Sequence, residues 1–221
     1  MKQDARELIA AIRSAHLTYC GFPKLENISE SVDRVVREGV KGDFVEAGVA
    51  LGGSAILLGR LKSSDVTLRL YDVFGMIPPP GDKDGQDAHQ RYQVIRSGTS
   101  PGLGVDMYYG YVDSLMEKVS LNLSRWGLSC EDHHIELNPG LFQHTLRPPG
   151  PVAFAHIDCD WYESVSTCID RIVPLLAKGG VIVFDDYESY SGCRRAVDEL
   201  MGRRPDLEVL FHRRSIGLRQ P

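Results

Sequence analysis

The sequence lacks any apolar run long enough to span a membrane or to form the hydrophobic part of a secretory signal. It also lacks a basic excess, because 25 lysines and arginines stand against 30 aspartates and glutamates, for a formal net charge of -5. Nucleic-acid binding depends on clustered positive charge, so this composition argues against a nucleic-acid partner. We therefore expect a cytoplasmic protein that neither enters a membrane nor binds nucleic acid.

Cysteine is scarce, and the five cysteines are widely scattered. No two of them have the Cys-x-x-Cys spacing of a zinc site, and they do not form the dense framework of a small secreted protein. Reduced thiols in a cytoplasm are the simplest interpretation. The chain of 221 residues, 43% of them hydrophobic, is long enough to bury one substantial core. We expect residues 1–221 to form a single domain.

Short apolar runs alternate with helical stretches along the chain. Strands are expected at residues 43–46, 66–71, 134–137, 152–157, 180–184, 207–211 and 215–218, and helices at 1–17, 53–63, 112–127, 163–177 and 191–202. This alternation is typical of an α/β fold with a doubly wound, mainly parallel sheet. The last two strands leave no room for a crossover helix, so they predict an antiparallel end to a seven-stranded sheet.

One segment, residues 75–110, interrupts the alternation. It contains the run Pro78-Pro79-Pro80 and several glycines, and it ends in Tyr108-Tyr109-Gly110-Tyr111. An excursion of this length within a compact domain is usually a lid or a binding loop. We call residues 75–110 the lid segment, and we expect it to be mobile and to close over an acceptor.

A glycine-rich turn, Glu46-Ala-Gly48-Val-Ala-Leu-Gly52-Gly53-Ser54, follows the first expected strand. Glycines at a strand-to-helix turn let the backbone approach a ligand closely and leave helix N–H groups free to meet it. The spacing differs from the Gly-x-Gly-x-x-Gly of dinucleotide-binding proteins. Glu46 suits a cationic group such as that of S-adenosylmethionine, and Asp72, which ends the second strand, suits ribose hydroxyls. The alternative is an ordinary turn that binds no ligand.

Four aspartates, Asp158, Asp160, Asp185 and Asp186, follow the fourth and fifth expected strands. The carboxyl ends of parallel strands face one crevice, so these carboxylates would crowd together and repel one another. Crowded buried carboxylates need protons, cationic partners or a metal. Oxygen ligands favour Mg²⁺, with Ca²⁺ and Mn²⁺ as alternatives. Asp160 or Glu163 is also a candidate helix N-cap, and His156 is expected to be a hydrogen-bonded core residue.

In combination, the sequence blocks resemble the macrocin O-methyltransferase family, which methylates sugar hydroxyls of natural products. The blocks that carry the resemblance are residues 42–49, 71–80, 122–128, 139–146, 156–164, 185–187 and 192–198. The resemblance implies a class I methyltransferase fold, S-adenosylmethionine as methyl donor and a divalent cation, usually Mg²⁺. The sequence departs from the family at Ala50-Leu51, where the family has Trp-Arg, and at His144, where many relatives have aspartate.

The resemblance also implies roles for individual residues. The metal ligands would be Asp158, Asp185 and Asp186, with Asp158 also the base, and Glu46, Gly48 and Asp72 would contact the cofactor. Beyond the resemblance, we expect Asp160 as an alternative base and Gly52, Ser54 and Gly140 as further cofactor contacts. We expect a homodimer that methylates a hydroxyl of a sugar or a related phenolic small molecule.

Other functions share parts of this pattern. A metal-dependent glycosyltransferase also uses an Asp-x-Asp motif, which Asp158-Cys159-Asp160 matches, but the glycine-rich turn on the first strand argues against it. A phosphatase with an Asp-x-Asp nucleophile would carry that motif after its first strand rather than its fourth. A non-catalytic relative that binds S-adenosylmethionine is the third alternative, and the retained acidic cluster argues against it.

Overall fold

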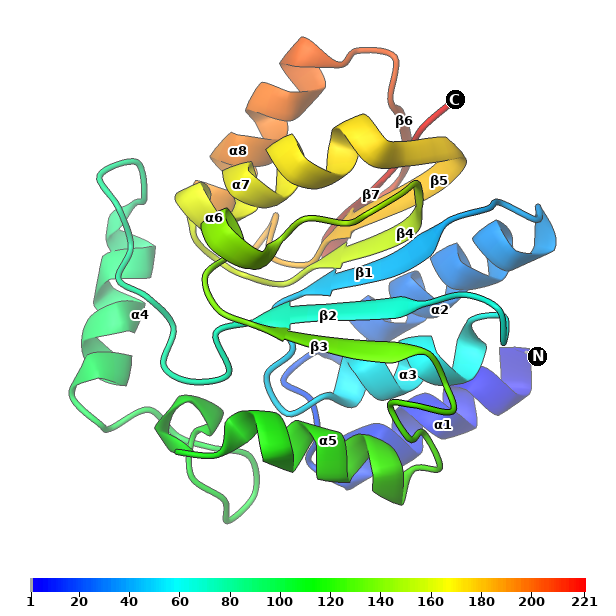
Figure 1. Cartoon of the computed structure of the whole chain (residues 1–221). Coiled ribbons are helices and arrows are strands. Elements are labelled where there is room, and N and C mark those ends of the chain that lie inside the picture. Colours follow the sequence, from blue (N-terminus) through cyan, green and yellow to red (C-terminus); the bar gives the residue numbers. More distant parts are fainter. Residues whose placement is uncertain (1) are drawn as a thin grey trace.

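Seven strands form one sheet in the order β3-β2-β1-β4-β5-β7-β6 in the computed structural model, which describes residues 2–221 (Figure 1). The strands are β1 (Asp43–Ala47), β2 (Leu68–Asp72), β3 (Ile135–Pro139), β4 (Val152–Ile157), β5 (Leu176–Phe184), β6 (Glu208–Arg213) and β7 (Ser215–Arg219). The first five pair in parallel, and β7 is antiparallel to both β5 and β6. The predicted mainly parallel sheet with an antiparallel end is confirmed.

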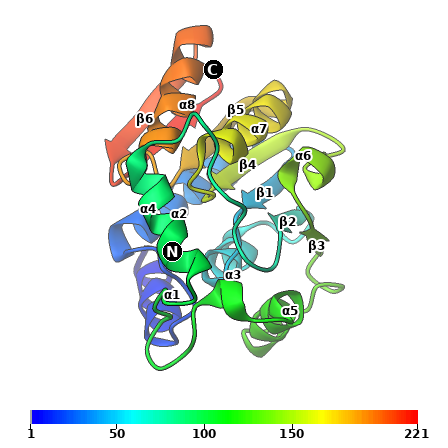
Figure 2. The ribbon, with the colours of Figure 1, turned by 90° about the vertical axis from the view of Figure 1, so that its left-hand side faces the viewer.

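Helices cover both faces of the sheet (Figures 1 and 2). One face carries α1 (Lys2–Ser14), α2 (Phe22–Arg37), α3 (Gly53–Leu61) and α5 (Leu115–Arg125), and the other carries α6 (Phe142–Thr145), α7 (Tyr162–Ile172) and α8 (Ser191–Arg203). Successive strand residues point to opposite faces, so Phe44 joins the core under α2 and α3 while Val45 joins the core under α7 and α8. None of the described helices is long and apolar enough to cross a membrane.

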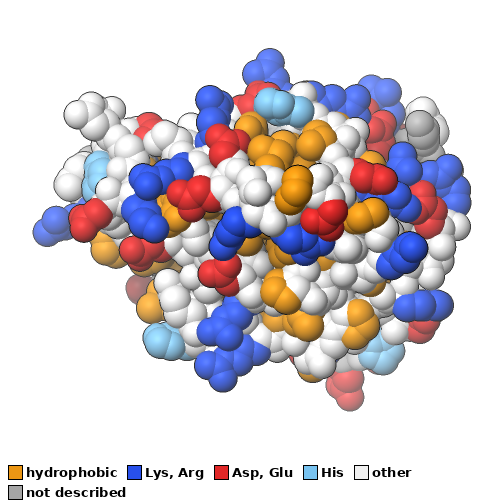
Figure 3. All heavy atoms as spheres, turned by 90° about the horizontal axis from the view of Figure 1, so that it is seen from above, with side chains coloured by type: hydrophobic (Ala, Val, Ile, Leu, Met, Phe, Trp, Pro, Cys, Tyr) orange, Lys and Arg blue, Asp and Glu red, His pale blue; other side chains and the backbone are white. Residues whose placement is uncertain are grey.

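The outer surface mixes charges of both signs. On the face seen from above in Figure 3, acidic and basic side chains alternate around small groups of hydrophobic ones. This distribution agrees with the near balance of acidic and basic residues in the sequence.

Besides the four-residue α6, two helices among the described residues were not predicted from the sequence. The first, α2, buries Leu25, Ile28, Val32 and Val35 on one side, and this i, i+3, i+7, i+10 spacing is a helical signal that the sequence interpretation missed. The second, α4 (Gln86–Arg96), lies within the lid segment, beyond the carboxyl ends of the central strands (Figures 1 and 2). The lid segment therefore contains regular structure that its prolines and glycines did not suggest.

Two aspartates attach the lid segment to the body of the protein. Asp84 is buried, and its Oδ1 accepts a hydrogen bond from the Tyr162 backbone N–H at 2.7 Å. Asp87 accepts from both the backbone N–H and the hydroxyl of Ser191, each at 2.7 Å. Tyr162 and Ser191 begin α7 and α8, so aspartates from another part of the chain cap both helices. The cap of α7 is therefore Asp84, and the expectation that Asp160 or Glu163 would serve as that cap was wrong.

Removal of the Asp84 anchor should loosen the lid segment. We expect Asp84→Ala to cost about 1–3 kcal/mol of unfolding free energy, because two backbone N–H groups lose their acceptor; these belong to Tyr162 and Gly81. Amide hydrogen exchange should become faster in residues 76–96. Asp82→Ala is the matched control, because Asp82 is exposed. Equal exchange rates in the two variants would contradict the anchoring role.

Candidate active site at the carboxyl ends of the central strands

The polar residues that the sequence analysis singled out gather where the central parallel strands end. Glu46 lies on β1, Asp72 ends β2, His156 lies on β4, and Asp185 directly follows β5. Because these strands are adjacent and parallel, their carboxyl ends open onto a common crevice.

The glycine-rich turn after β1 passes directly against the acidic loop after β4. Gly48 has φ 91, and a Cβ added to it would lie 1.8 Å from the carbonyl oxygen of Asp158. Any other residue would force the two loops apart, so Gly48 is needed for both its conformation and its lack of a side chain. The Asp158 N–H also donates to the carbonyl of Ala47 at 2.8 Å. The turn and the acidic loop thus form one continuous surface.

Asp72 holds the shape of this turn. Its Oδ2 accepts from the backbone N–H groups of Val49 at 2.7 Å and Ala50 at 3.2 Å, and its Oδ1 accepts from Phe74 at 2.8 Å. Burial raises the pKa of Asp72, and the backbone donors offset this only in part. Oδ2 uses both of its lone pairs on the turn, but Oδ1 accepts from Phe74 and retains a second lone pair, so the same side chain can hold the turn and still accept a ligand hydroxyl.

A cleft opens between the turn, the end of β2 and the lid segment. It is lined by Gly48, Asp72, Val73, Gly75, Ile77, Pro78, Tyr109, Leu141, Phe142, Gln143, Asp158, Cys159, Asp160 and Ser164. Among the residues predicted to contact the cofactor, Gly48 and Asp72 line this cleft, whereas Glu46, Gly52, Ser54 and Gly140 do not. A wider depression, lined by Asp87 and residues 188–199, contains none of the four aspartates, so the cleft is the stronger candidate site.

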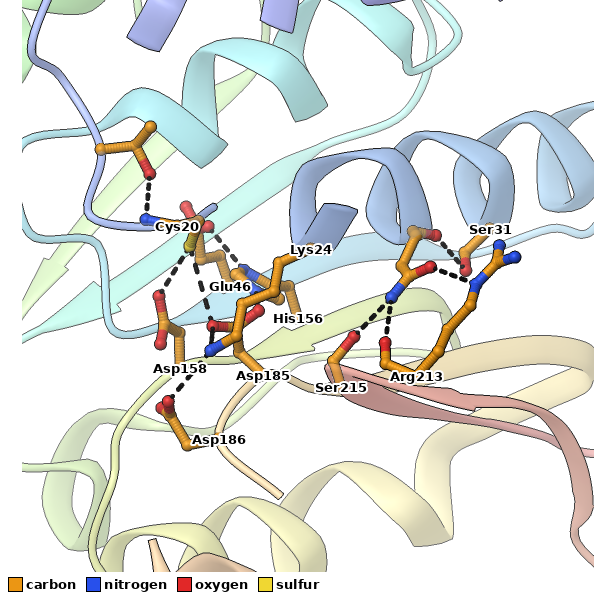
Figure 4. Close-up of polar contacts among 12 residues, drawn as sticks. Cys20, Lys24, Ser31, Glu46, His156, Asp158, Asp185, Asp186, Arg213 and Ser215 are labelled. Carbon is orange, nitrogen blue, oxygen red and sulfur yellow. Dashed lines mark hydrogen bonds and ion pairs between the residues drawn. The ribbon is translucent and has the colours of Figure 1, made fainter. Parts of the chain in front are cut away.

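The four predicted aspartates do meet, in two overlapping groups. Asp158, Asp160 and Asp186 each place one oxygen within 4.8 Å of the others, and Asp158 and Asp185 form a second such group with the thiol of Cys20 (Figure 4). The predicted ligands Asp158, Asp185 and Asp186 are thus divided between the two groups: Asp158 belongs to both, Asp186 to the first and Asp185 to the second. Among the described residues, Asp185 Oδ1 and Asp186 Oδ2 are buried and have no hydrogen-bond partner. This set of oxygen donors fits a hard divalent cation.

Two basic side chains balance part of this negative charge. Lys24 Nζ, from α2, lies 2.7 Å from Asp185 Oδ2 and 3.3 Å from Asp186 Oδ1. His156 is fully buried, its Nδ1 lies 2.9 Å from Glu46 Oε1 and its Nε2 lies 3.7 Å from Asp185 Oδ1. The expectation that His156 is a hydrogen-bonded core residue is confirmed. The sequence interpretation missed Lys24, because it did not identify α2.

The surroundings give the aspartates different affinities for a proton. Burial and the neighbouring carboxylates Asp185 and Asp186 raise the pKa of Asp158 well above its usual range, and burial and Asp186 do the same for Asp160. Burial acts in the same direction on Asp185, but hydrogen bonds and charge from His156 and Lys24 outweigh it and lower the pKa of Asp185. Burial lowers the pKa of His156, yet its bonds to Asp185 and Glu46 raise it to about 10. Asp158 and Asp160 are therefore the groups in this cluster that can most readily take up a proton.

Comparison with known proteins identifies a consistent set of relatives. The family model for macrocin-O-methyltransferase (TylF) matches residues 1–206. A tetracenomycin-C 4'-O-methyltransferase of Streptomyces olivaceus is 32% identical over 192 residues, covering 84% of this chain and 68% of that protein. Mycinamicin III 3''-O-methyltransferase of Micromonospora griseorubida is 30% identical over 213 residues, covering 91% of this chain and 76% of that protein.

Solved structures agree with these sequence relatives. The O-methyltransferase NovP superposes with a TM-score of 0.76 and 27% identity, covering 92% of this chain and 82% of that one. The calicheamicin methyltransferase CalS11 shares the fold with a TM-score of 0.64 and 18% identity, covering 98% of this chain and 91% of that one.

Asp72 offers a direct test of the turn and the cleft. We expect Asp72→Ala to weaken S-adenosylmethionine binding by about 1–3 kcal/mol, because the turn loses its anchor and the ribose loses an acceptor. Isothermal titration calorimetry without any added metal would measure this. Asp65→Ala, which removes the same charge from an exposed position, is the control. An unchanged affinity in Asp72→Ala would mean that the ribose binds elsewhere.

Proposed function

The chain belongs to the macrocin-O-methyltransferase family, and we propose that it methylates a hydroxyl of a sugar carried by a natural product. Its family membership and its relatives show that it is an S-adenosylmethionine-dependent O-methyltransferase. The observation that carries the proposal is the contact between Gly48 and Asp158. Because of this contact, a methyl donor on the glycine-rich turn lies next to the carboxylates that would receive the acceptor hydroxyl.

The acceptor class is proposed from the relatives. One is described as a methyltransferase of a dimethoxy-rhamnosyl tetracenomycin, acting at the 4' oxygen, and another as acting at the 3'' oxygen of mycinamicin III. Both descriptions favour a sugar hydroxyl over a phenol as the acceptor of this chain. A metal-dependent glycosyltransferase is no longer favoured, because the relatives that match across most of the chain are all methyltransferases.

We propose that Asp158, Asp185 and Asp186 hold a divalent cation, with Mg²⁺ the expected ion. The buried Oδ2 of Asp186 supports this, because it has no hydrogen-bond partner and a buried charged oxygen without a partner is costly. When bound, such a cation would lower the pKa of the acceptor hydroxyl and fix its position.

The protein's own residues supply the remaining steps. The carboxylate of Asp158, which lines the cleft, takes the proton of the acceptor hydroxyl. The freed oxygen lone pair then forms a bond to the methyl carbon as the carbon–sulfur bond of the donor breaks, and S-adenosylhomocysteine leaves as a neutral thioether. Much of the catalysis would come from positioning, since Gly48 brings donor and base close together.

Metal removal tests the proposed cation. We expect EDTA to abolish methyl transfer to glycosides that carry a 6-deoxyhexose with free hydroxyls, and Mg²⁺ to restore it. Mass spectrometry of the products would measure transfer, with a simple catechol as the phenolic comparison. S-adenosylmethionine binding, followed by calorimetry in the same samples, should be unaffected by EDTA. Full activity in a chelated, metal-free preparation would contradict the role of the acidic cluster.

Two variants separate the base from the ligands. Asp158→Asn should lower kcat by ~10²–10⁴ at every Mg²⁺ concentration, because an amide cannot accept the proton at neutral pH. Asp186→Asn should instead weaken cation binding and be partly rescued by excess Mg²⁺. Both variants would be assayed across a Mg²⁺ titration. If saturating Mg²⁺ fully rescues Asp158→Asn, then Asp158 is only a ligand and Asp160 becomes the candidate base.

A further inference from the structure

Lys24 reaches from α2 into the acidic cluster (Figure 4). Its ammonium group donates to Asp185 Oδ2 at 2.7 Å and contacts Asp186 Oδ1 at 3.3 Å. The side chain of Lys24 is only 18% exposed. These two carboxylates are the ones proposed above as cation ligands, so a lysine charge already lies against the groups that a divalent cation would bind, on the oxygens opposite Asp185 Oδ1 and Asp186 Oδ2.

The position of α2 does not depend on this contact. Buried Asn27, one turn further along the helix, donates to the carbonyl of Arg213 at 2.8 Å and to the hydroxyl of Ser215 at 2.9 Å. It also accepts from the guanidinium of Arg213 at 2.8 Å. The loop between α1 and α2 is also held in place, because the Gly53 N–H donates to the carbonyl of Leu17 at 2.9 Å. The backbone is therefore fixed independently, and the four-carbon stem of Lys24 can move without moving the helix.

The positive charge of Lys24 would oppose the binding of a divalent cation to the same carboxylates. Lys24 and His156 are the basic groups in contact with the buried acids Glu46, Asp185 and Asp186. A divalent cation that binds the same two aspartates is repelled by the ammonium group, and in a poorly solvated site this repulsion is strong. Each cation must therefore weaken the binding of the other.

We propose that Lys24 is an internal cation that competes with the divalent cation for Asp185 and Asp186. In the metal-free protein it keeps these carboxylates together, and it withdraws from them when the divalent cation binds. The inference rests on the cation site of the proposed function and adds to it a residue that sets the affinity of that site.

Calorimetric titration with Mg²⁺, and with Mn²⁺ in parallel, tests the competition. We expect Lys24→Met to bind the cation at least about tenfold more tightly than the unsubstituted protein, since the competing charge is gone. Lys24→Arg keeps the charge and should stay close to the unsubstituted affinity. Lys41→Met is the matched control, because Lys41 is exposed. It removes the same charge away from the acidic cluster and should also leave the affinity unchanged.

A measurement on the unsubstituted protein covers the case in which Lys24→Met fails to fold. Acetylation of lysine amines, followed by peptide mass spectrometry, reports how accessible each ammonium group is. Saturating Mg²⁺ should speed the acetylation of Lys24 and leave that of Lys41 unchanged. Slower or unchanged labelling of Lys24 would overturn the competition.

The outcomes separate this inference from the cation site itself. If all variants bind Mg²⁺ equally, or if Lys24→Met binds it more weakly, Lys24 does not compete and the cation site stands. If neither Mg²⁺ nor Mn²⁺ binds to any variant, the cation site of the proposed function is wrong, and the competition falls with it.

Discussion

The burial of several carboxyl groups at the carboxyl ends of β1, β4 and β5 is the constraint on which the rest of the site depends. Glu46, Asp185 and Asp186 are buried, and the half-buried Asp158 and Asp160 lie beside them. Buried negative charges at such distances must be neutralised by a proton, a basic group or a metal. These carboxyl groups are neutralised in different ways. His156 and Lys24 stabilise the charge of Asp185, whereas Asp158 and Asp160 have a raised affinity for a proton. A site arranged in this way can both hold a cation and accept a proton.

The glycine-rich turn packs against the same group of carboxyl side chains at the strand ends. Gly48 leaves no space between itself and the backbone of Asp158, so the loop that carries the acids and the turn that is expected to hold the donor cannot shift independently. Asp72 fixes the other side of that turn through three backbone N–H groups. The distance between the glycine-rich turn and Asp158 is thus set by backbone contacts, which are stiffer than side-chain contacts. For a reaction that relies on positioning, this is the relevant property.

The sequence predicted the strands and the strand-end residues well, because both depend on local patterns. Apolar runs indicated all seven strands, and parallel connectivity alone brings Asp158 near Asp186. Features that depend on contacts between distant parts of the chain were missed. Lys24 lies 161 residues from Asp185 in the sequence, and no periodicity could pair them. Asp84 likewise caps a helix 78 residues away. The helix α2 itself was predictable, because its apolar residues have helical spacing. The sequence analysis overlooked that spacing.

The lid segment and the loop that carries Asp158 and Asp160 are mechanically linked in this fold. Asp84 of the lid segment binds the backbone N–H of Tyr162, which lies only two residues after Asp160. Gly192 supports the same contact, because a Cβ there would lie 2.0 Å from Asp84 Oδ1. A change in the lid segment that accommodates a different sugar would therefore pull on the start of α7 and on the loop that carries the acids. Because of this link, substitutions in the lid segment should alter kcat together with KM, even though the lid segment contributes none of the four aspartates.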